Sequence, residues 1–367
     1  MNPYQFTCDR CGTVLPIGAA VGCEGDRLCP DCSDELTVLC DCCSTRIYLD
    51  NAVCDTRTTL CRSCYEAHYV TCSDCDAILR ESETYYGEDD GEPYCYTCYQ
   101  RHADDRPIHD YSYAPELVFH GDGPRYFGVE LEIDGMGTDN ACARKFLTLA
   151  NRNAERLYIK TDGSLHEGME LVTHPMTLDY HMDDMPWPEL LQTVIDEGYR
   201  SHQTNTCGLH VHISREAFGE SDMAQELAIA RLLYFTEKFW SELLKFSRRT
   251  EQQINRWAAR YGMKLSPRDV MKSAKDSDAG RYTAINLTNA ETIEVRLFRG
   301  TLKLNTLLAT LQMVNAMCDV ALSLSDEELQ ALSWHDFLDR LSEPELIQYL
   351  KERNLYRNDP IPYEEDA

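Results

Sequence analysis

The chain has no long apolar run, few basic residues for its acidic content, and only three of its eighteen cysteines after residue 98. No apolar stretch approaches the ~20 residues that a membrane-spanning helix requires, so we do not expect a membrane protein. The first ten residues, MNPYQFTCDR, contain neither a basic cluster nor an apolar segment and do not resemble a secretory signal. We therefore expect a cytoplasmic location.

Basic residues are also too scarce for nucleic-acid binding. The chain has 35 lysines and arginines against 62 aspartates and glutamates, a formal net charge of -27, which repels phosphate backbones. The first 110 residues contain twenty-one acidic residues, eight arginines and no lysine, so they lack the basic face that a DNA-binding module needs. This part of the chain is expected to recognise protein or to be architectural. The length of 367 residues fits two or three domains.

The cysteines form a tandem repeat at the amino-terminal end. Fifteen of the eighteen precede residue 99, which indicates two kinds of domain in one chain. They fall into CxxC pairs, and seventeen or nineteen residues separate the two pairs of each unit. The first cysteine of successive units recurs at a 32-residue interval. The three sets are Cys8, Cys11, Cys29 and Cys32; Cys40, Cys43, Cys61 and Cys64; and Cys72, Cys75, Cys95 and Cys98.

Two CxxC pairs at this separation are typical of a tetrahedral zinc site, because each pair folds a tight knuckle that directs two thiolates at one ion. We predict three structural zinc ions in three small treble-clef or LIM-like modules within residues 1–105, at about 5–36, 37–69 and 70–105. The alternatives are iron–sulfur clusters and disulfides; disulfides are disfavoured because no secretory signal is seen. The spacing leaves out Cys23, Cys42 and Cys54, as small buried residues or alternative ligands.

Residues 106–124 contain proline, glycine, histidine and acidic residues without helical periodicity, and are predicted to be a connector. Tyr111, Tyr113 and Phe119 within it are apolar enough to be partly buried. A catalytic domain is expected over 125–325, and helices with an acidic tail over 326–367. Within these regions, the periodicity of residues 223–261 predicts a long core-facing helix, and residues 304–324 predict a second.

Four segments of the second half alternate polar and apolar residues and are predicted to be strands with polar faces. In chain order they are YFGVELEI with Glu130 and Glu132, MELVT with Glu170 after a turn at Asp162, TCGLHVHIS with His210 and His212, and TIEVRLF with Glu294 and Arg296, which Arg299 follows. Any one of them is equally compatible with a solvent-facing strand. Together, carboxylates and an imidazole suit magnesium or manganese, and arginines suit the triphosphate that these metals bind.

The ordered set GVELE, DGSL with MELVTHP, CGLHVHIS and TIEVRLFRGTL resembles the amidoligase family, within the glutamine synthetase-like carboxylate–amine ligase superfamily, from about residue 107 to 310. The resemblance implies an α+β fold with a glutamine synthetase-like antiparallel sheet and helices. It also implies an ATP-dependent carbon–nitrogen ligase that uses two magnesium or manganese ions. A substrate carboxylate is phosphorylated to an acyl phosphate, and an amine then displaces phosphate to form an amide or isopeptide bond.

Carried over by position, the resemblance implies ligands for two divalent ions and contacts for the nucleotide and acyl phosphate. Asp162 and Glu170 are eight residues apart, like the corresponding pair in glutamine synthetase, but Asp162 is shorter than the glutamate found there and leaves room for a water. One ion is assigned to Glu132, Asp162 and Glu170 and the other to Glu130, His210 and Glu294, while Arg281, Arg296 and Arg299 contact phosphates and His212 and Asn205 are further candidates.

The sequence does not specify which carboxylate or amine reacts. Three metal-binding repeats exceed what a solubility tag requires, so we predict that they recruit a protein or peptide substrate. Two other functions stay open: a non-catalytic zinc-binding adaptor with an inactive ligase fold, and a metal-dependent amide hydrolase that uses the same ligands without ATP.

Overall fold

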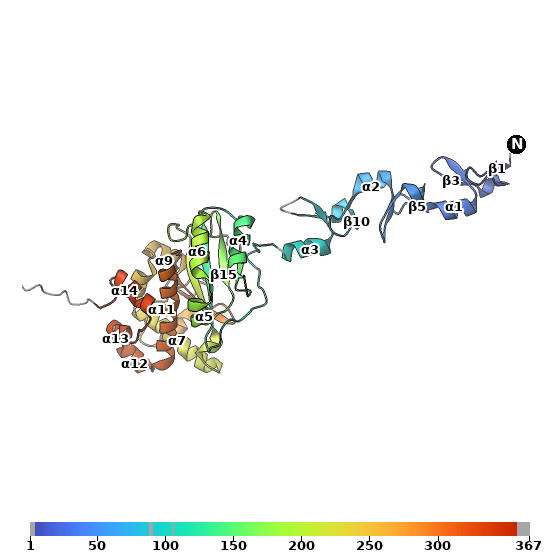
Figure 1. Ribbon diagram of the computed structural model, residues 1–367. Coiled ribbons are helices and arrows are strands. Elements are labelled where there is room, and N and C mark those ends of the chain that lie inside the picture. The colour runs from blue at the N-terminus through green and yellow to red at the C-terminus, as the bar shows by residue number, and fades with distance from the viewer. Residues whose placement is uncertain (1–3, 88–90, 105, 358–367) are drawn as a thin grey trace, which may run out of the picture. The chain divides into compact units, whose positions relative to one another are not determined.

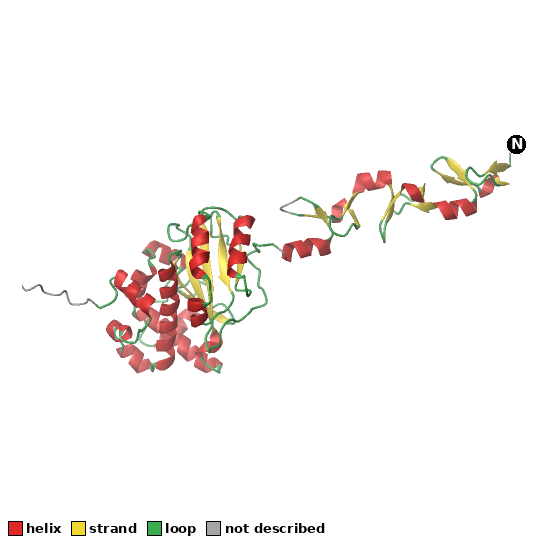
Figure 2. Cartoon of the chain, viewed as in Figure 1, coloured by secondary structure: helices red, strands yellow, loops and turns green. Residues whose placement is uncertain are grey.

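The computed structural model describes residues 4–87, 91–104 and 106–357. The chain divides into two compact units, Met1–Arg106 and Pro107–Ala367, which Figures 1 and 2 show in ribbon form. The acidic tail predicted at the end of the chain, at 359–367, lies outside the described residues.

The first unit repeats one motif three times. In each repeat, a two-stranded hairpin with a CxxC pair in its turn is followed by a 3-10 turn, a second hairpin and a helix at the second CxxC pair. The elements are β1 (Gln5–Thr7), β2 (Val14–Pro16), β3 (Val21–Cys23), β4 (Asp26–Leu28) and α1 (Pro30–Leu36); β5 (Thr37–Leu39), β6 (Arg46–Tyr48), β7 (Ala52–Cys54), β8 (Thr59–Cys61) and α2 (Arg62–His68); and β9 (Tyr69–Thr71), β10 (Ile78–Arg80), β11 (Tyr85–Tyr86), β12 (Pro93–Tyr94) and α3 (Tyr96–Asp104).

Backbone geometry recurs with the cysteines. Gly12, Ser44 and Asp76 follow the first CxxC of each repeat and have positive φ angles of 77°, 58° and 58°, the left-handed conformation that closes a tight turn. Cys29 and Cys61 are the N-caps of α1 and α2, where their sulfurs accept from the backbone N–H three residues on. Each knuckle is therefore formed by the backbone as well as by its cysteines.

The second unit contains a six-stranded antiparallel sheet with strand order β14-β15-β13-β16-β18-β17. This confirms the predicted combination of an antiparallel sheet with helices. The strands are β13 (Phe127–Asp134), β14 (Leu157–Lys160), β15 (Gly168–Thr173), β16 (Gly208–Ser214), β17 (Ile285–Asn286) and β18 (Thr292–Arg299).

One face of this sheet packs on helices. Alternate residues of β13, such as Val129, Leu131 and Ile133, are fully buried in a core that includes Phe146 and Leu311. Figure 1 shows helices α4 and α6 beside this sheet. The helices are α4 (Asn140–Ala150), α5 (Leu178–Asp183), α6 (Trp187–Asp196), α7 (Asp222–Lys238), α8 (Trp240–Ser247), α9 (Glu251–Trp257), α10 (Pro267–Lys275), α11 (Leu304–Ser323), α12 (Asp326–Ala331), α13 (Trp334–Leu338) and α14 (Pro344–Glu352).

The single long helix expected at 223–261 is wrong, because the segment forms α7, α8 and α9. The backbone breaks at Phe239, and Arg248 ends α8 in a left-handed conformation with a φ of 64°. Thr250 then begins α9 with a capping box that Gln253 completes. Hydrophobic spacing continues across both breaks, so the periodicity did not reveal them.

Two residues of the connector also differ from expectation. Tyr111 and Phe119 are 50% and 55% exposed, whereas Tyr113 is half-buried and stacks on His109. The expectation that no apolar stretch approaches the length of a membrane span is wrong for α11, the one described helix long and apolar enough to cross a membrane by length and composition. Of that stretch, 78% is buried inside the unit, as in the core helix of a folded domain.

Candidate active site on the open face of the sheet

Strand register brings the predicted polar residues together on the sheet face opposite the core. Glu130 lies directly across from His210, and Glu132 directly across from Glu170. On the far side of β16, His212 pairs with Glu294. Because side chains on one face alternate along each strand, these pairs project from the same face.

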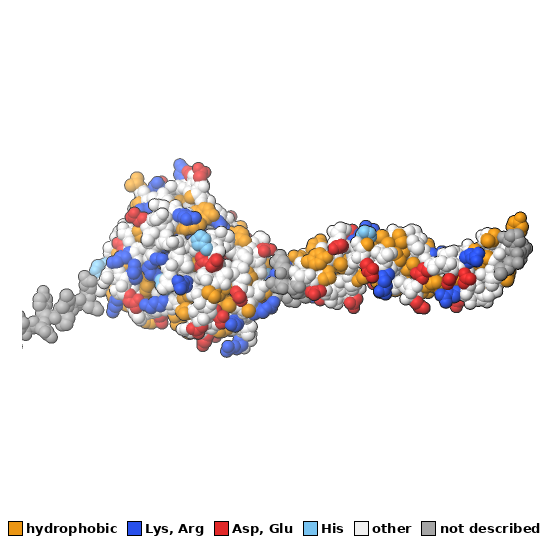
Figure 3. Space-filling model, turned by 90° about the horizontal axis from the view of Figure 1, so that it is seen from above, with side chains coloured by type: hydrophobic (Ala, Val, Ile, Leu, Met, Phe, Trp, Pro, Cys, Tyr) orange, Lys and Arg blue, Asp and Glu red, His pale blue; other side chains and the backbone are white. Residues whose placement is uncertain are grey.

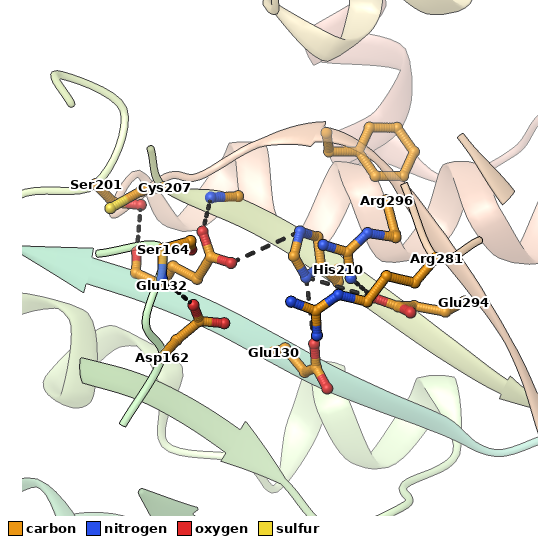
Figure 4. Close-up of polar contacts among 12 residues, drawn as sticks. Glu130, Glu132, Asp162, Ser164, Ser201, Cys207, His210, Arg281, Glu294 and Arg296 are labelled. Carbon is orange, nitrogen blue, oxygen red and sulfur yellow. Dashed lines mark hydrogen bonds and ion pairs between the residues drawn. The ribbon is translucent and has the colours of Figure 1, made fainter. Parts of the chain in front are cut away.

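The first cluster of possible metal ligands consists of Glu130, His210 and Glu294, with donor atoms within 4.8 Å of one another. The Nδ1 atom of His210 lies 3.2 Å from Glu130 Oε2 and 3.5 Å from Glu294 Oε1. Figure 4 shows these three side chains turned toward one another. They form the same set that the resemblance assigned to one divalent ion.

The second cluster consists of Glu132, Glu170 and His210, also within 4.8 Å. His210 Nε2 lies 3.9 Å from Glu132 Oε1, so the ring stands between the two clusters and faces one with each nitrogen. Asp162, predicted as a ligand here, is in neither cluster. It follows β14, accepts from the backbone N–H of Ser164 at 2.6 Å, and lines the adjoining cavity.

The acidic groups are crowded and largely buried. Burial and the charges of Glu130 and Glu132 hold the pKa of Glu170 well above its ordinary value. Burial also raises the pKa of Glu132. Burial alone would raise the pKa of Glu130 too, but the neighbouring His212 and His210 hold it well below its ordinary value. Hard carboxylate oxygens with one imidazole fit magnesium or manganese, whose charge would offset this repulsion.

The carboxylates share the site with cationic side chains. Arg296 is paired with Glu294, to which Asn286 also donates at 2.8 Å. Lys160 stands opposite Glu170 in the strand register. Arg281 donates to the Tyr111 hydroxyl.

The site opens into a polar cavity of about 300 Å³ lined by Glu130, Asp162, Glu170, Glu294 and Arg296 among others. Tyr111, Ser112 and Tyr113 form part of its wall. The segment predicted as a connector therefore contributes directly to the site.

The remaining predicted residues are placed less centrally. His212 lies 3.0 Å from Glu130 Oε1 and lines the cavity. Arg299 donates to the carbonyl of Thr204 at 3.3 Å and is not among the residues lining the described polar cavity. Asn205 is exposed on the loop before β16 and does not line this cavity either.

Sequence reasoning missed Arg249 and Gly208. Arg249 is buried, lines a small cleft beside Glu132 and His210, and donates from Nε to the carbonyl of Phe298 at 3.1 Å. Burial lowers its pKa to about 10, while the charge of Glu132 acts in the opposite direction. The signal in the sequence was the capping pattern at Thr250, which begins α9 immediately after this arginine.

Gly208 donates its backbone N–H to Glu132 Oε2. A Cβ atom at this position would lie 2.4 Å from His210 Nε2 and 2.6 Å from Arg249 Nη2. The absence of a side chain at Gly208 therefore lets both the histidine and the arginine lie close to the backbone of residue 208, which explains why a glycine begins this strand.

The twelve predicted cysteine ligands form three compact sets, and each could hold a metal ion. Sulfur–sulfur distances of 3.7 Å for Cys11–Cys29 and 3.8 Å for Cys43–Cys61 match the edge of about 3.8 Å of a tetrahedron with ~2.3 Å metal–sulfur bonds. A disulfide would need about 2.05 Å, and the cysteines are free thiols. Backbone N–H groups of Cys11 and Cys29 lower the pKa of Cys8 to about 6, which favours its thiolate, whereas the sulfurs of Cys29 and Cys11 raise the pKa of Cys32 well above its ordinary value.

Among known proteins, a family model described as a putative amidoligase enzyme matches residues 145–318. No curated protein matches the chain. Matching solved structures include a bifunctional glutathione synthetase from Pasteurella multocida, at 14% identity and a TM-score of 0.39 over 63% of this chain and 46% of that one. Another is the complex between the prokaryotic ubiquitin-like protein Pup and its ligase PafA, at 9% identity and a TM-score of 0.32 over 63% and 62%.

The chain thus spans 46% of the first structure's length and 62% of the second's. The family match contains Glu170, His210 and Glu294 and begins after Glu130 and Glu132. It supports an enzyme of the amidoligase kind, a class of ligase.

Proposed function

We propose that the chain is an ATP-dependent carboxylate–amine ligase that forms an amide or isopeptide bond through an acyl phosphate. The observation that carries this proposal is the pair of carboxylate clusters that share His210 on one sheet face, with Arg296 and Arg281 on the same cavity. Phosphoryl transfer depends mainly on positioning and charge neutralisation, which is what such a set of groups supplies.

The two clusters would hold two divalent ions, one at Glu130, His210 and Glu294 and the other at Glu132 and Glu170, with Asp162 contributing from the cavity wall. When bound, magnesium or manganese would supply positive charge to the phosphate oxygens of ATP. Arg296, Arg281 and Lys160 line the same cavity and add cationic donors for the phosphates and the substrate carboxylate.

The proposed reaction needs no protein nucleophile. An oxygen of the substrate carboxylate bonds to the terminal phosphorus of ATP as ADP leaves. The amine nitrogen then bonds to the carbonyl carbon, the bond from that carbon to the phosphate oxygen breaks, and the nitrogen gives up a proton. Cys207 is not a candidate nucleophile, because burial raises its pKa to about 12 and the thiol stays protonated.

The experiment that tests this function measures ADP release with candidate carboxylates and amines in the presence of magnesium. A product lighter by one water than the sum of its parts, found by mass spectrometry, identifies both substrates. Glu132→Ala should abolish ADP release, and Glu167→Ala, which alters an exposed acid before β15, is the matched control. A metal-dependent hydrolase would instead cleave amides without ATP, and that result would refute the ligase.

We further propose that the amino-terminal unit binds three zinc ions and recruits a protein or peptide substrate. Exposed apolar side chains recur in it, as with Ile17 and Leu49, which begin equivalent turns of successive repeats and are 49% and 52% exposed. Figure 3 shows apolar and acidic side chains side by side on the visible face of this unit. Such a surface suits a protein partner better than a phosphate backbone.

Deleting residues 1–105 tests the recruiting role. The second unit has its own core, so the truncated chain should fold and bind ATP as the full chain does. Ligation to the macromolecular substrate should fall at least tenfold through a higher KM. Equal turnover by the two proteins would refute recruitment.

A further inference from the structure

A second, larger cavity adjoins the polar cavity. It measures about 650 Å³, and Glu130 and His212 line both cavities, so the two meet at these residues. We call this second cavity the apolar groove. Its apolar walls are formed by Leu117, Phe119, Tyr126, Tyr158, Val172 and Pro175.

The two cavities differ in their charged side chains, because basic residues line only the polar cavity. Glu216 and Glu291 are exposed on the walls of the apolar groove, and the described residues that line it include no lysine or arginine. The polar cavity is lined by Lys160, Arg281 and Arg296 together with the carboxylates that we propose as ligands of divalent ions. With the proposed divalent ions on its carboxylates, the polar cavity suits phosphates and a carboxylate, whereas the groove, with acidic but no basic residues, suits a cation with an apolar body.

We propose that the apolar groove binds the amine substrate, and that this amine carries an aromatic or long aliphatic group. The inference rests on the proposed ligase function and specifies its second substrate. The nitrogen lies at the end marked by Glu130 and His212, where it reaches the polar cavity. The apolar body packs against Tyr126 and Tyr158. Glu216 attracts the protonated amine before it loses its proton and reacts.

Gly128 offers a steric test of this assignment. It lines the groove on β13, two residues before Glu130 on the same face. A Cβ atom there would lie 3.5 Å from the Cβ of His212 and 3.8 Å from the carbonyl oxygen of Thr173, which are ordinary contacts. Alanine therefore fits, whereas a leucine side chain has to extend into the groove.

The experiment uses the full chain and isothermal titration calorimetry. The probes are phenethylamine, its anionic counterpart 3-phenylpropionate, and magnesium ATP. The wild type should bind phenethylamine at least tenfold more tightly than 3-phenylpropionate. Gly128→Leu should abolish phenethylamine binding and leave ATP affinity within twofold, and Gly128→Ala should retain both.

Glu216→Gln combined with Glu291→Gln should weaken phenethylamine roughly three- to tenfold, since two partly solvated attractions are lost. Glu189→Gln combined with Glu220→Gln, which alters two exposed acids outside the groove, should change nothing. These surface variants keep the test decisive if Gly128→Leu does not fold.

Three results would overturn the assignment. The first is that the wild type does not bind phenethylamine, and the second is that it binds 3-phenylpropionate as tightly as phenethylamine. The third is that Gly128→Leu loses ATP binding but still binds phenethylamine, which would mean that the groove binds the nucleotide base. The two proposals fail separately, because absence of ADP release with any substrate pair refutes the ligase, whereas loss of the preference for amine over carboxylate refutes the groove assignment.

Discussion

Glu170 faces Glu132 directly across a strand pair, an arrangement of like charges that destabilises a sheet unless a cation offsets it. Both carboxyl groups are buried, with 2% exposure for Glu170 and 3% for Glu132. Burying a carboxylate costs free energy, so packing does not explain why these residues are glutamates. A side chain held at a cost in folding free energy is expected where it serves binding or catalysis.

Glu170→Gln should therefore affect stability and activity in opposite directions. In magnesium-free buffer, the free energy of unfolding of the second unit should rise by about 1 kcal/mol, because the folded chain no longer buries an ionisable carboxyl beside Glu130 and Glu132. ADP release should be lost. Denaturation followed by tryptophan fluorescence reports on this unit, because all four tryptophans lie after residue 106. Exposed Glu167→Gln should change neither quantity; a less stable Glu170→Gln would contradict the expectation.

Arg249 gives the second prediction at this scale. Arg249→Gln should lower ADP release roughly 10- to 100-fold, because the small cleft beside Glu132 loses its buried cation. Arg152→Gln, at an exposed position, is the control for loss of one arginine. Unchanged activity of Arg249→Gln would remove this residue from the site.

At the scale of elements, alternation along the strands was enough to predict which polar residues share a face. It could not give the pairing of strands, because the register that sets His210 against Glu130 joins segments eighty residues apart. Arg249 was not predicted, because it lies at a helix break that the hydrophobic spacing does not mark. The contribution of Tyr111 and Phe119 to the cavity walls was not predicted either, because exposed aromatic residues in a connector carry no periodic signal.

The helix α5 supplies a test by pH. His181 is fully buried there, and its ring hydrogen bonds to the carbonyl of Phe127 at 3.0 Å. Burial lowers the pKa of His181 from 6.5 to about 4. Between pH 4 and pH 6.5 only the unfolded chain gains this proton. The contribution of neutral His181 to the free energy of unfolding is therefore complete above pH 6.5, and it falls by up to about 1.4 kcal/mol per pH unit as the pH drops toward 4.

His181→Gln should flatten that slope in tryptophan-monitored urea denaturation at pH 5 and pH 7. His335→Gln, at an exposed position of α13, should leave it unchanged. A wild type equally stable at both pH values would contradict the prediction.

At the scale of the whole molecule, the three cysteine sets predict the number of zinc ions that one chain binds. The purified chain should carry three zinc ions, and Cys8→Ser or Cys72→Ser should each reduce the count toward two, because a tetrahedral site loses a ligand. Cys54→Ser, outside the three sets, should retain three. Elemental analysis gives the count. A full complement in Cys72→Ser would contradict the assignment.

The segment that begins the second unit at Pro107 supplies Tyr111 and Tyr113 to the polar cavity and Leu117 and Phe119 to the apolar groove. An engineer who exchanges the repeats for a different targeting module should therefore join it at residue 106. A junction at residue 124 would remove part of the wall of both cavities.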